Sequence, residues 1–169
     1  EVYKRYEMYS YLANTYAEIG NASKNLNMFS KTLENYEKAK QYFFKEEMSY
    51  NIIRISIVIS DIYNQLGLSE IAREHIKPIM DSALLFKDQI VLGRIESALS
   101  KTYEIEFKYD IAIEHLEKAR SYYNHLDKNN LMAPCLIDLS YLYYLYGDAV
   151  KGHSFINQAQ SILDTRLTN

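Results

Sequence analysis

A repeat at an interval of forty residues places the strongest constraint on how this chain folds. Each copy has a large aliphatic residue, a serine, two spacers and a tyrosine, and a residue with little or no side chain follows twelve positions after the serine. The serines are Ser60, Ser100 and Ser140, and the small residues are Ala72, Ala112 and Gly152. Such a period predicts a stack of similar supersecondary units, each packed mainly on its neighbours.

A further copy is assigned to the start of the chain, where Leu12, Ala13 and Tyr16 precede Gly20. It lies forty-seven residues before the next copy, so it is predicted to carry about two extra helical turns. Apolar positions three and four residues apart indicate that each unit is a pair of antiparallel helices. The predicted helices span 2–19, 22–46, 49–66, 69–87, 89–106, 109–126, 130–146 and 149–165.

Glycine and proline mark the expected ends and irregularities of these helices. Gly20, Gly67 and Gly147 are expected to end helices, because glycine adopts the left-handed conformation at low cost. The serines should face the small residues where paired helices cross, since little side-chain bulk there lets the backbones approach. Pro78 is expected to kink or split its helix, because proline removes a backbone donor.

Composition and charge argue against several classes of function. The net charge is −3, and both signs are interspersed, so binding to nucleic acid is not expected. One cysteine forms no disulfide framework or metal cluster, and no apolar run approaches the ~18 residues of a membrane helix. His75 and His115 are interpreted as solvated residues, and Cys135 as a small core residue. No cofactor is expected, and a cytoplasmic location is favoured over a periplasmic one.

The repeat from Leu139 through Tyr143 and Gly147 to Ala159 resembles a tetratricopeptide repeat (TPR). Units of forty residues are longer than the usual repeat of about 34, and they resemble those of bacterial regulators, including peptide-pheromone receptors and signalling proteins. The resemblance covers 1–169 and implies one all-α, right-handed solenoid domain of about four helix pairs. It is expected to be a piece of a larger protein, without catalytic activity, that binds a peptide, a protein segment or an attached output domain in a concave groove.

The resemblance also indicates which side chains line that groove. In this family the groove residues lie on the first helix of each unit, at fixed offsets from the large core position. The implied groove residues are Asn14, Arg54, Ile57, Asp61, Asn64, Arg94, Ser97, Lys101, Glu104, Tyr141 and Tyr144. Arg54 and Arg94 are equivalent in adjacent units, so together they suit a carboxylate or phosphate. The alternative for each residue is a solvated helix face with local ion pairs.

Two functions from different classes remain open at this point, and a third is disfavoured. The first is a sensor or regulatory binding domain, and the second is a static scaffold or oligomerisation module, including a homodimer formed through one end. An enzyme is disfavoured, since the sequence contains no nucleophile–base pair, metal-ligand set or cofactor loop. The segment GDAVKG is not a phosphate loop, because His153 stands where that motif has lysine.

Overall fold

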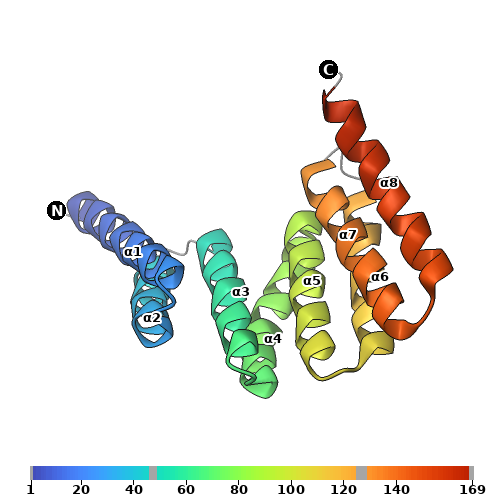
Figure 1. Cartoon of the computed structure of the whole chain (residues 1–169). Helices are drawn as coiled ribbons and strands as arrows, with labels where there is room; N and C mark the ends of the chain where they lie inside the picture. The colour runs from blue at the N-terminus through green and yellow to red at the C-terminus, as the bar shows by residue number, and fades with distance from the viewer. Residues whose placement is uncertain (1, 46–48, 125–128, 168–169) are drawn as a thin grey trace.

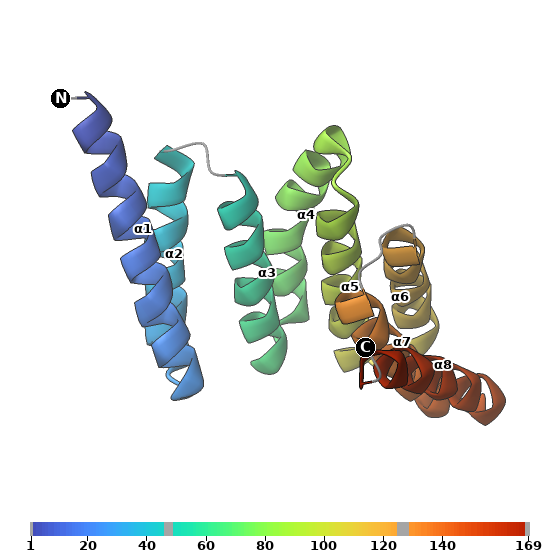
Figure 2. The ribbon, with the colours of Figure 1, turned by 90° about the horizontal axis from the view of Figure 1, so that it is seen from above.

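The chain folds into a row of helices without β-structure in the part that the computed structural model describes, residues 2–45, 49–124 and 129–167 (Figure 1). The helices are α1 (Val2–Asn25), α2 (Phe29–Lys45), α3 (Ser49–Gln65), α4 (Ser69–Phe86), α5 (Gln89–Ile105), α6 (Tyr109–Asn124), α7 (Asn129–Tyr146) and α8 (Ala149–Leu167). Consecutive helices pair as antiparallel hairpins, and each hairpin packs on the next (Figures 1 and 2). The predicted all-α solenoid of four helix pairs is confirmed.

The turns inside the four hairpins keep one strict register. Asn27, Gly67, Phe107 and Gly147 lie forty residues apart, and all have positive φ values, of 55°, 73°, 60° and 95°. This left-handed residue ends each first helix, and it is a glycine in only two of the four turns. The forty-residue interval therefore holds for the first unit too, and the forty-seven-residue offset was wrong.

Gly20 does not end the first helix, as the sequence had suggested, because α1 continues to Asn25 and α2 begins only at Phe29. Gly20 is buried in the register of Ser60, at the point where α1 crosses α2. A Cβ atom at Gly20 would lie 2.8 Å from the Tyr36 ring. The glycine is therefore a contact residue, and the turn belongs to Asn27, a residue type that tolerates the left-handed conformation.

The predicted split at Pro78 does not occur, since α4 runs from Ser69 to Phe86 as one helix. Pro78 lies on the exposed side of α4, where water can hydrate the carbonyl group that loses its helical donor. The carbonyl oxygen of Pro78 itself accepts a hydrogen bond from the Ser82 hydroxyl at 3.2 Å.

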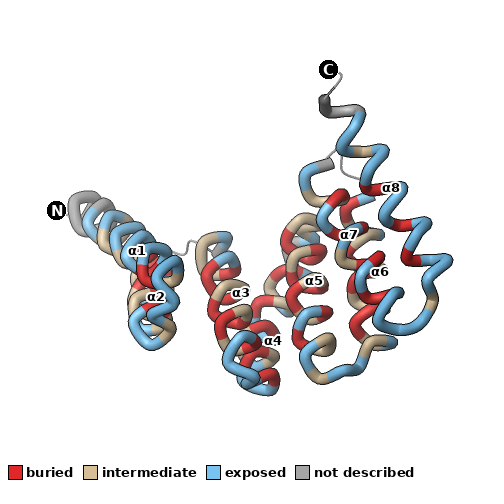
Figure 3. Tube along the Cα trace, viewed as in Figure 1, coloured by how far each residue is buried: buried red, intermediate tan, exposed pale blue. Residues whose placement is uncertain are grey.

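The helices of each pair meet at the small residues that define the repeat. All three serines and their partners Ala72, Ala112 and Gly152 are buried, and the Ser140 hydroxyl donates to the Gly152 carbonyl oxygen at 2.8 Å. These contacts confirm the predicted crossing. The apolar core is divided into three clusters that follow the chain. Figure 3 marks the buried residues along the helices.

An aromatic stack lies beside the crossing in three of the four pairs. Tyr63 stacks on His75 with 5.2 Å between ring centroids, and Tyr103 stacks on His115 at 5.1 Å. Tyr143 stacks on Phe155 in the equivalent place, at 5.4 Å. The interpretation of both histidines as solvated residues was wrong, because their position in the repeat packs a ring against the tyrosine of the same unit.

Replacing Gly93 by alanine should destabilise the protein, because the new Cβ atom would lie 2.3 Å from the ring of Tyr123, which is 3% exposed. The overpacking should cost about 1–3 kcal/mol, which outweighs a gain of about 1 kcal/mol in helix propensity. Thermal denaturation followed by circular dichroism measures the effect.

Gly152→Ala is the matched control, because its Cβ would meet Tyr144 at 2.9 Å, and that ring is 42% exposed and free to move. The control should be neutral or slightly stabilising. Equal melting temperatures for Gly93→Ala and the wild type would contradict this account of the Gly93–Tyr123 contact.

Candidate functional site

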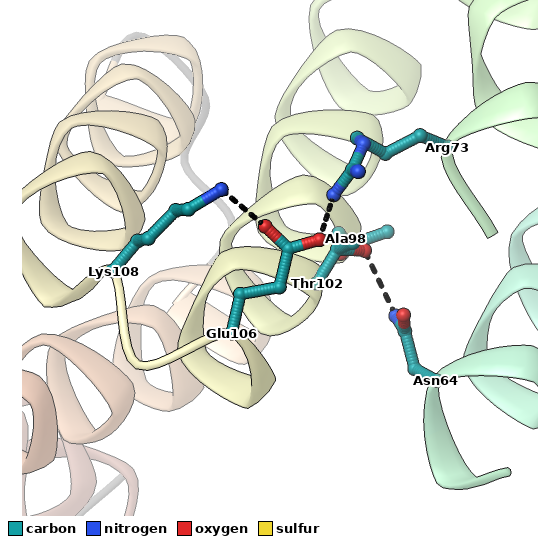
Figure 4. Close-up of polar contacts among 6 residues, drawn as sticks. All are labelled: Asn64, Arg73, Ala98, Thr102, Glu106 and Lys108. Atoms are coloured by element: carbon teal, nitrogen blue, oxygen red, sulfur yellow. Dashed lines mark hydrogen bonds and ion pairs between the residues drawn. The ribbon is translucent and has the colours of Figure 1, made fainter. Parts of the chain in front are cut away.

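The second and third helix pairs are joined by a polar contact between their first helices. The Asn64 side-chain amide on α3 donates to the Thr102 hydroxyl on α5 at 2.9 Å, and that hydroxyl donates to the Ala98 carbonyl oxygen at 3.1 Å (Figure 4). Asn64 is only 5% exposed. The structure therefore places this predicted groove residue inside the contact between helices, where it fixes α3 against α5.

An ion-pair bridge reinforces the same junction from the second helix. Glu106 follows the end of α5, and its carboxylate contacts the Arg73 guanidinium of α4 and the Lys108 ammonium at 2.8 Å (Figure 4). Hydrogen bonds from Lys108 and then Arg73 hold the pKa of Glu106 below its usual value. With Asn64, this bridge sets how far the side chains of α3 lie from those of α5.

Six of the predicted groove residues come together in one pocket between α3 and α5, which we call the α3–α5 pocket. They are Arg54, Ile57 and Asp61 from α3, with Arg94, Ser97 and Lys101 from α5. The pocket has a volume of about 240 Å³, and Val58, Ala98 and Tyr123 also line it. The forty-residue offset explains the convergence, because equivalent positions in adjacent units lie side by side.

The α3–α5 pocket carries an excess of positive charge. Arg54, Arg94 and Lys101 face a single carboxylate, Asp61, and in the described part of the chain none of the four makes an ion pair. Arg94 donates a long hydrogen bond, of 3.4 Å, to the Tyr50 hydroxyl. Burial raises the pKa of Asp61, although Lys101 opposes the shift. Burial therefore disfavours the charged form of Asp61.

Two further carboxylates lie on the neighbouring first helices. Burial raises the pKa of Glu104 on α5, and the nearby Asp138 on α7 raises it further. Burial also raises the pKa of Asp138, while Lys101 opposes that shift. Asp138 was missed at the sequence level because it occupies the position of Ala98, which the family offsets do not count as groove. The sequence signal that could have pointed to Asp138 is that it is a single acidic residue within an otherwise apolar stretch.

The remaining predicted residues lie outside the α3–α5 pocket. Asn14 is exposed on α1, in the register of Arg54. Tyr141 is exposed on α7, whereas the Tyr144 ring covers Gly152 and meets His153 edge-on, with 5.5 Å between ring centroids. Tyr144 therefore packs on its own partner helix, and it leaves only part of its ring for a ligand.

The site offers binding groups and little that suits catalysis. Cys135 is buried, with its sulfur 3.6 Å from the Leu116 carbonyl oxygen, and burial raises the pKa of the thiol to about 12. The described residues contain no cluster of three or more histidine, cysteine or acidic side chains placed to hold a metal ion. Across the same residues, no helix combines the length and the apolar character that a membrane crossing requires.

Sequence comparison relates this chain to a known protein over part of its length. No family model matches the chain. RNA polymerase-associated protein CTR9 of Saccharomyces cerevisiae is 25% identical over 97 residues, which are 57% of this chain and 9% of CTR9.

Solved structures show the same helical architecture. BtubC from P. vanneervenii superimposes with a TM-score of 0.78 at 17% identity, over 94% of this chain and 65% of BtubC. A putative kinesin light chain from Podospora anserina with nearly identical TPR-like repeats gives a TM-score of 0.66 at 14% identity, over 91% of this chain and 76% of that one. The fold is that of a TPR-type helical-repeat protein, and the chain spans less than two thirds of BtubC.

Replacing Glu104 by glutamine should stabilise the protein at pH 7 and leave its stability near pH 4 unchanged. Burial and Asp138 raise the folded-state pKa of Glu104, so the folded state holds this proton more tightly than the unfolded state does. Stability is therefore lost as pH rises from the usual glutamate pKa, about 4.3, through the raised one. The variant should gain on the order of 0.5 kcal/mol at pH 7.

Urea denaturation at both pH values measures this difference. Glu114→Gln, at an exposed site on α6, is the control and should show no such pH-dependent gain. A loss of stability in Glu104→Gln at pH 7 would show that the carboxylate is favourably paired after all.

Proposed function

We propose that this chain is a non-catalytic interaction module that binds a peptide or protein segment on the face formed by its first helices. The proposal rests on one observation, the α3–α5 pocket, whose lining combines three cationic side chains and one carboxylate with apolar residues such as Ile57 and Val58. An acidic side chain or a phosphate would lie between Arg54 and Arg94, since guanidinium groups bind both with paired hydrogen bonds.

Arg54 and Arg94 form no ion pair within the described part of the chain, and this supports the proposal of an anionic ligand from outside the chain. Arg54 is exposed, and Arg94 has only the Tyr50 hydroxyl as a hydrogen-bond partner in the described part of the chain. An arriving anion would therefore displace little more than water. Ile57 and Val58 would receive an apolar side chain next to the anionic group, which adds affinity that does not depend on salt.

The wider role that we propose is a sensor or regulatory domain of a bacterial signalling or transcription-regulating protein. The forty-residue units, which resemble those of bacterial regulators, support this role. In this proposal 1–169 is one solenoid domain of a longer protein, and an attached output domain responds to the ligand. A helical-repeat stack suits this task, because ligand contacts that span two units favour one curvature of the stack over others.

Exchanging both arginines for glutamate should abolish ligand binding without unfolding the protein. Short fluorescein-labelled peptides with a fixed central glutamate and randomised flanks serve as the probe, and fluorescence anisotropy measures their binding. Arg54→Glu with Arg94→Glu should weaken binding at least 100-fold, because two favourable contacts become repulsive. Raised salt should weaken wild-type binding.

Lys31→Glu with Lys118→Glu is the matched control, since both lysines are exposed on second helices and the net charge changes equally. This variant should bind as the wild type does. Wild-type affinity in the double arginine variant would remove the α3–α5 pocket from the proposal.

As a second candidate function, an apolar stripe on α1 favours an oligomerisation module. Met8, Tyr11 and Ile19 on α1, with Leu26 directly after its end, are between 45% and 75% exposed. Exposed apolar stripes on soluble proteins commonly mark interaction surfaces. A second copy of the chain, meeting this stripe with its own α1, would bury both.

Light scattering coupled to gel filtration tests the oligomerisation module. The wild type should elute as a dimer, and Tyr11→Lys with Leu26→Lys should convert it to a monomer. Leu85→Lys with Phe107→Lys, at exposed positions away from α1, should leave the dimer intact. A monomeric wild type at high concentration would exclude this candidate.

A further inference from the structure

A second, larger cavity lies between α2, α3 and α4, and we call it the α2–α4 cavity. Its volume is about 870 Å³, more than three times that of the α3–α5 pocket. Apolar side chains form much of its lining, namely Phe44, Ile52, Ile53, Pro78 and Ile79. Cavities of about 300–1,000 Å³ with mostly apolar walls and a few polar groups are typical sites for small molecules.

Ser56 lines this cavity, and its buried hydroxyl group has no hydrogen-bond partner among the described residues. The residue is 1% exposed. Hydroxyl groups on other helices, such as that of Thr32 on α2 and that of Thr102 on α5, donate to the carbonyl oxygen four residues earlier. A buried hydroxyl without a partner is costly, so Ser56 calls for a partner that the chain does not supply.

The repeat shows why this cavity is open at Ser56. The equivalent residue in the third unit is Glu96, whose carboxylate lies 2.6 Å from the ring nitrogen of His115. The equivalent residue in the fourth unit is Leu136, which lines a smaller cavity of about 500 Å³ between α6, α7 and α8. Both side chains fill space that the serine leaves free.

We propose that the α2–α4 cavity binds a small, mostly apolar molecule whose hydroxyl or carbonyl oxygen hydrogen-bonds to Ser56. Isoleucine side chains on α3 and α4 would cover the apolar body of the ligand. Lys40 and Glu74 lie in the lining with opposite charges, so the cavity has no net preference for a charged ligand. This site is separate from the α3–α5 pocket and does not depend on the function proposed for that pocket.

The neighbouring histidine is consistent with an uncharged ligand. His75 also lines the α2–α4 cavity, and burial, reinforced by Lys40, lowers its pKa. Its imidazole is therefore neutral at pH 7. It adds a hydrogen-bonding group to the wall without adding a charge.

Titration with 1-octanol, followed by methyl NMR of the isoleucines, tests this proposal on the intact chain. The signals of Ile52, Ile53 and Ile79 should shift and saturate in the wild type. Ser56→Ala keeps the cavity but removes the hydroxyl, so the affinity should fall about three- to tenfold. Ser56→Leu introduces the side chain found at Leu136, where the equivalent cavity is only about 500 Å³, so it should shrink the cavity and weaken octanol binding.

Ser60→Ala is the control, because Ser60 is also buried on α3 with an unpaired hydroxyl, but it does not line the cavity. This variant should bind octanol as the wild type does. Absence of saturable shifts in the wild type, or equal affinity in the wild type and Ser56→Ala, would overturn the proposal. An equal loss in Ser60→Ala would also overturn it, because the effect would then belong to α3 in general.

Discussion

The close approach of two helices at small residues is the contact on which the rest of this structure depends. Where Ser140 meets Gly152, the backbones come near enough for a side chain on one helix to bond the carbonyl group of the other. In three of the four units a tyrosine then lies beside the crossing and stacks on a ring of the partner helix. Each hairpin becomes a rigid unit in this way, and rigid units of equal shape can stack in a regular series.

Stacking turns a separation of forty residues in sequence into adjacency in space, and differences between equivalent positions then give each junction its own chemistry. Arg54 and Arg94 are neighbours for this reason, whereas the same register holds Asn14 on α1 and Pro134 on α7. Ser56 follows the same rule, since its equivalents in the third and fourth units are Glu96 and Leu136. The architecture is therefore shared by all units, while the surfaces proposed to bind ligands come from residues in which the units differ.

The pKa shifts differ between the contacts that join two hairpins and the face formed by the first helices. The ion pairs of Glu106 join two hairpins, and they lower the pKa of its carboxyl group. Asp61, Glu104 and Asp138 on the first helices have raised pKa values, mainly because of burial. Charges without ion-pair partners among the described residues are costly to keep, and the binding proposal gives the cations among them, Arg54 and Arg94, an anionic partner.

The sequence by itself determined the helix pairs, most of their boundaries and the small residues at the crossings, because helical periodicity and turn propensity are local properties. It misassigned Gly20 because a glycine can end a helix or admit a close contact, and only the position of Tyr36 distinguishes the two. The aromatic partners of His75 and His115, the Asn64–Thr102 contact and the place of Asp138 were likewise decided by tertiary structure. Each depends on which side chain of another helix arrives opposite, and no local pattern encodes that.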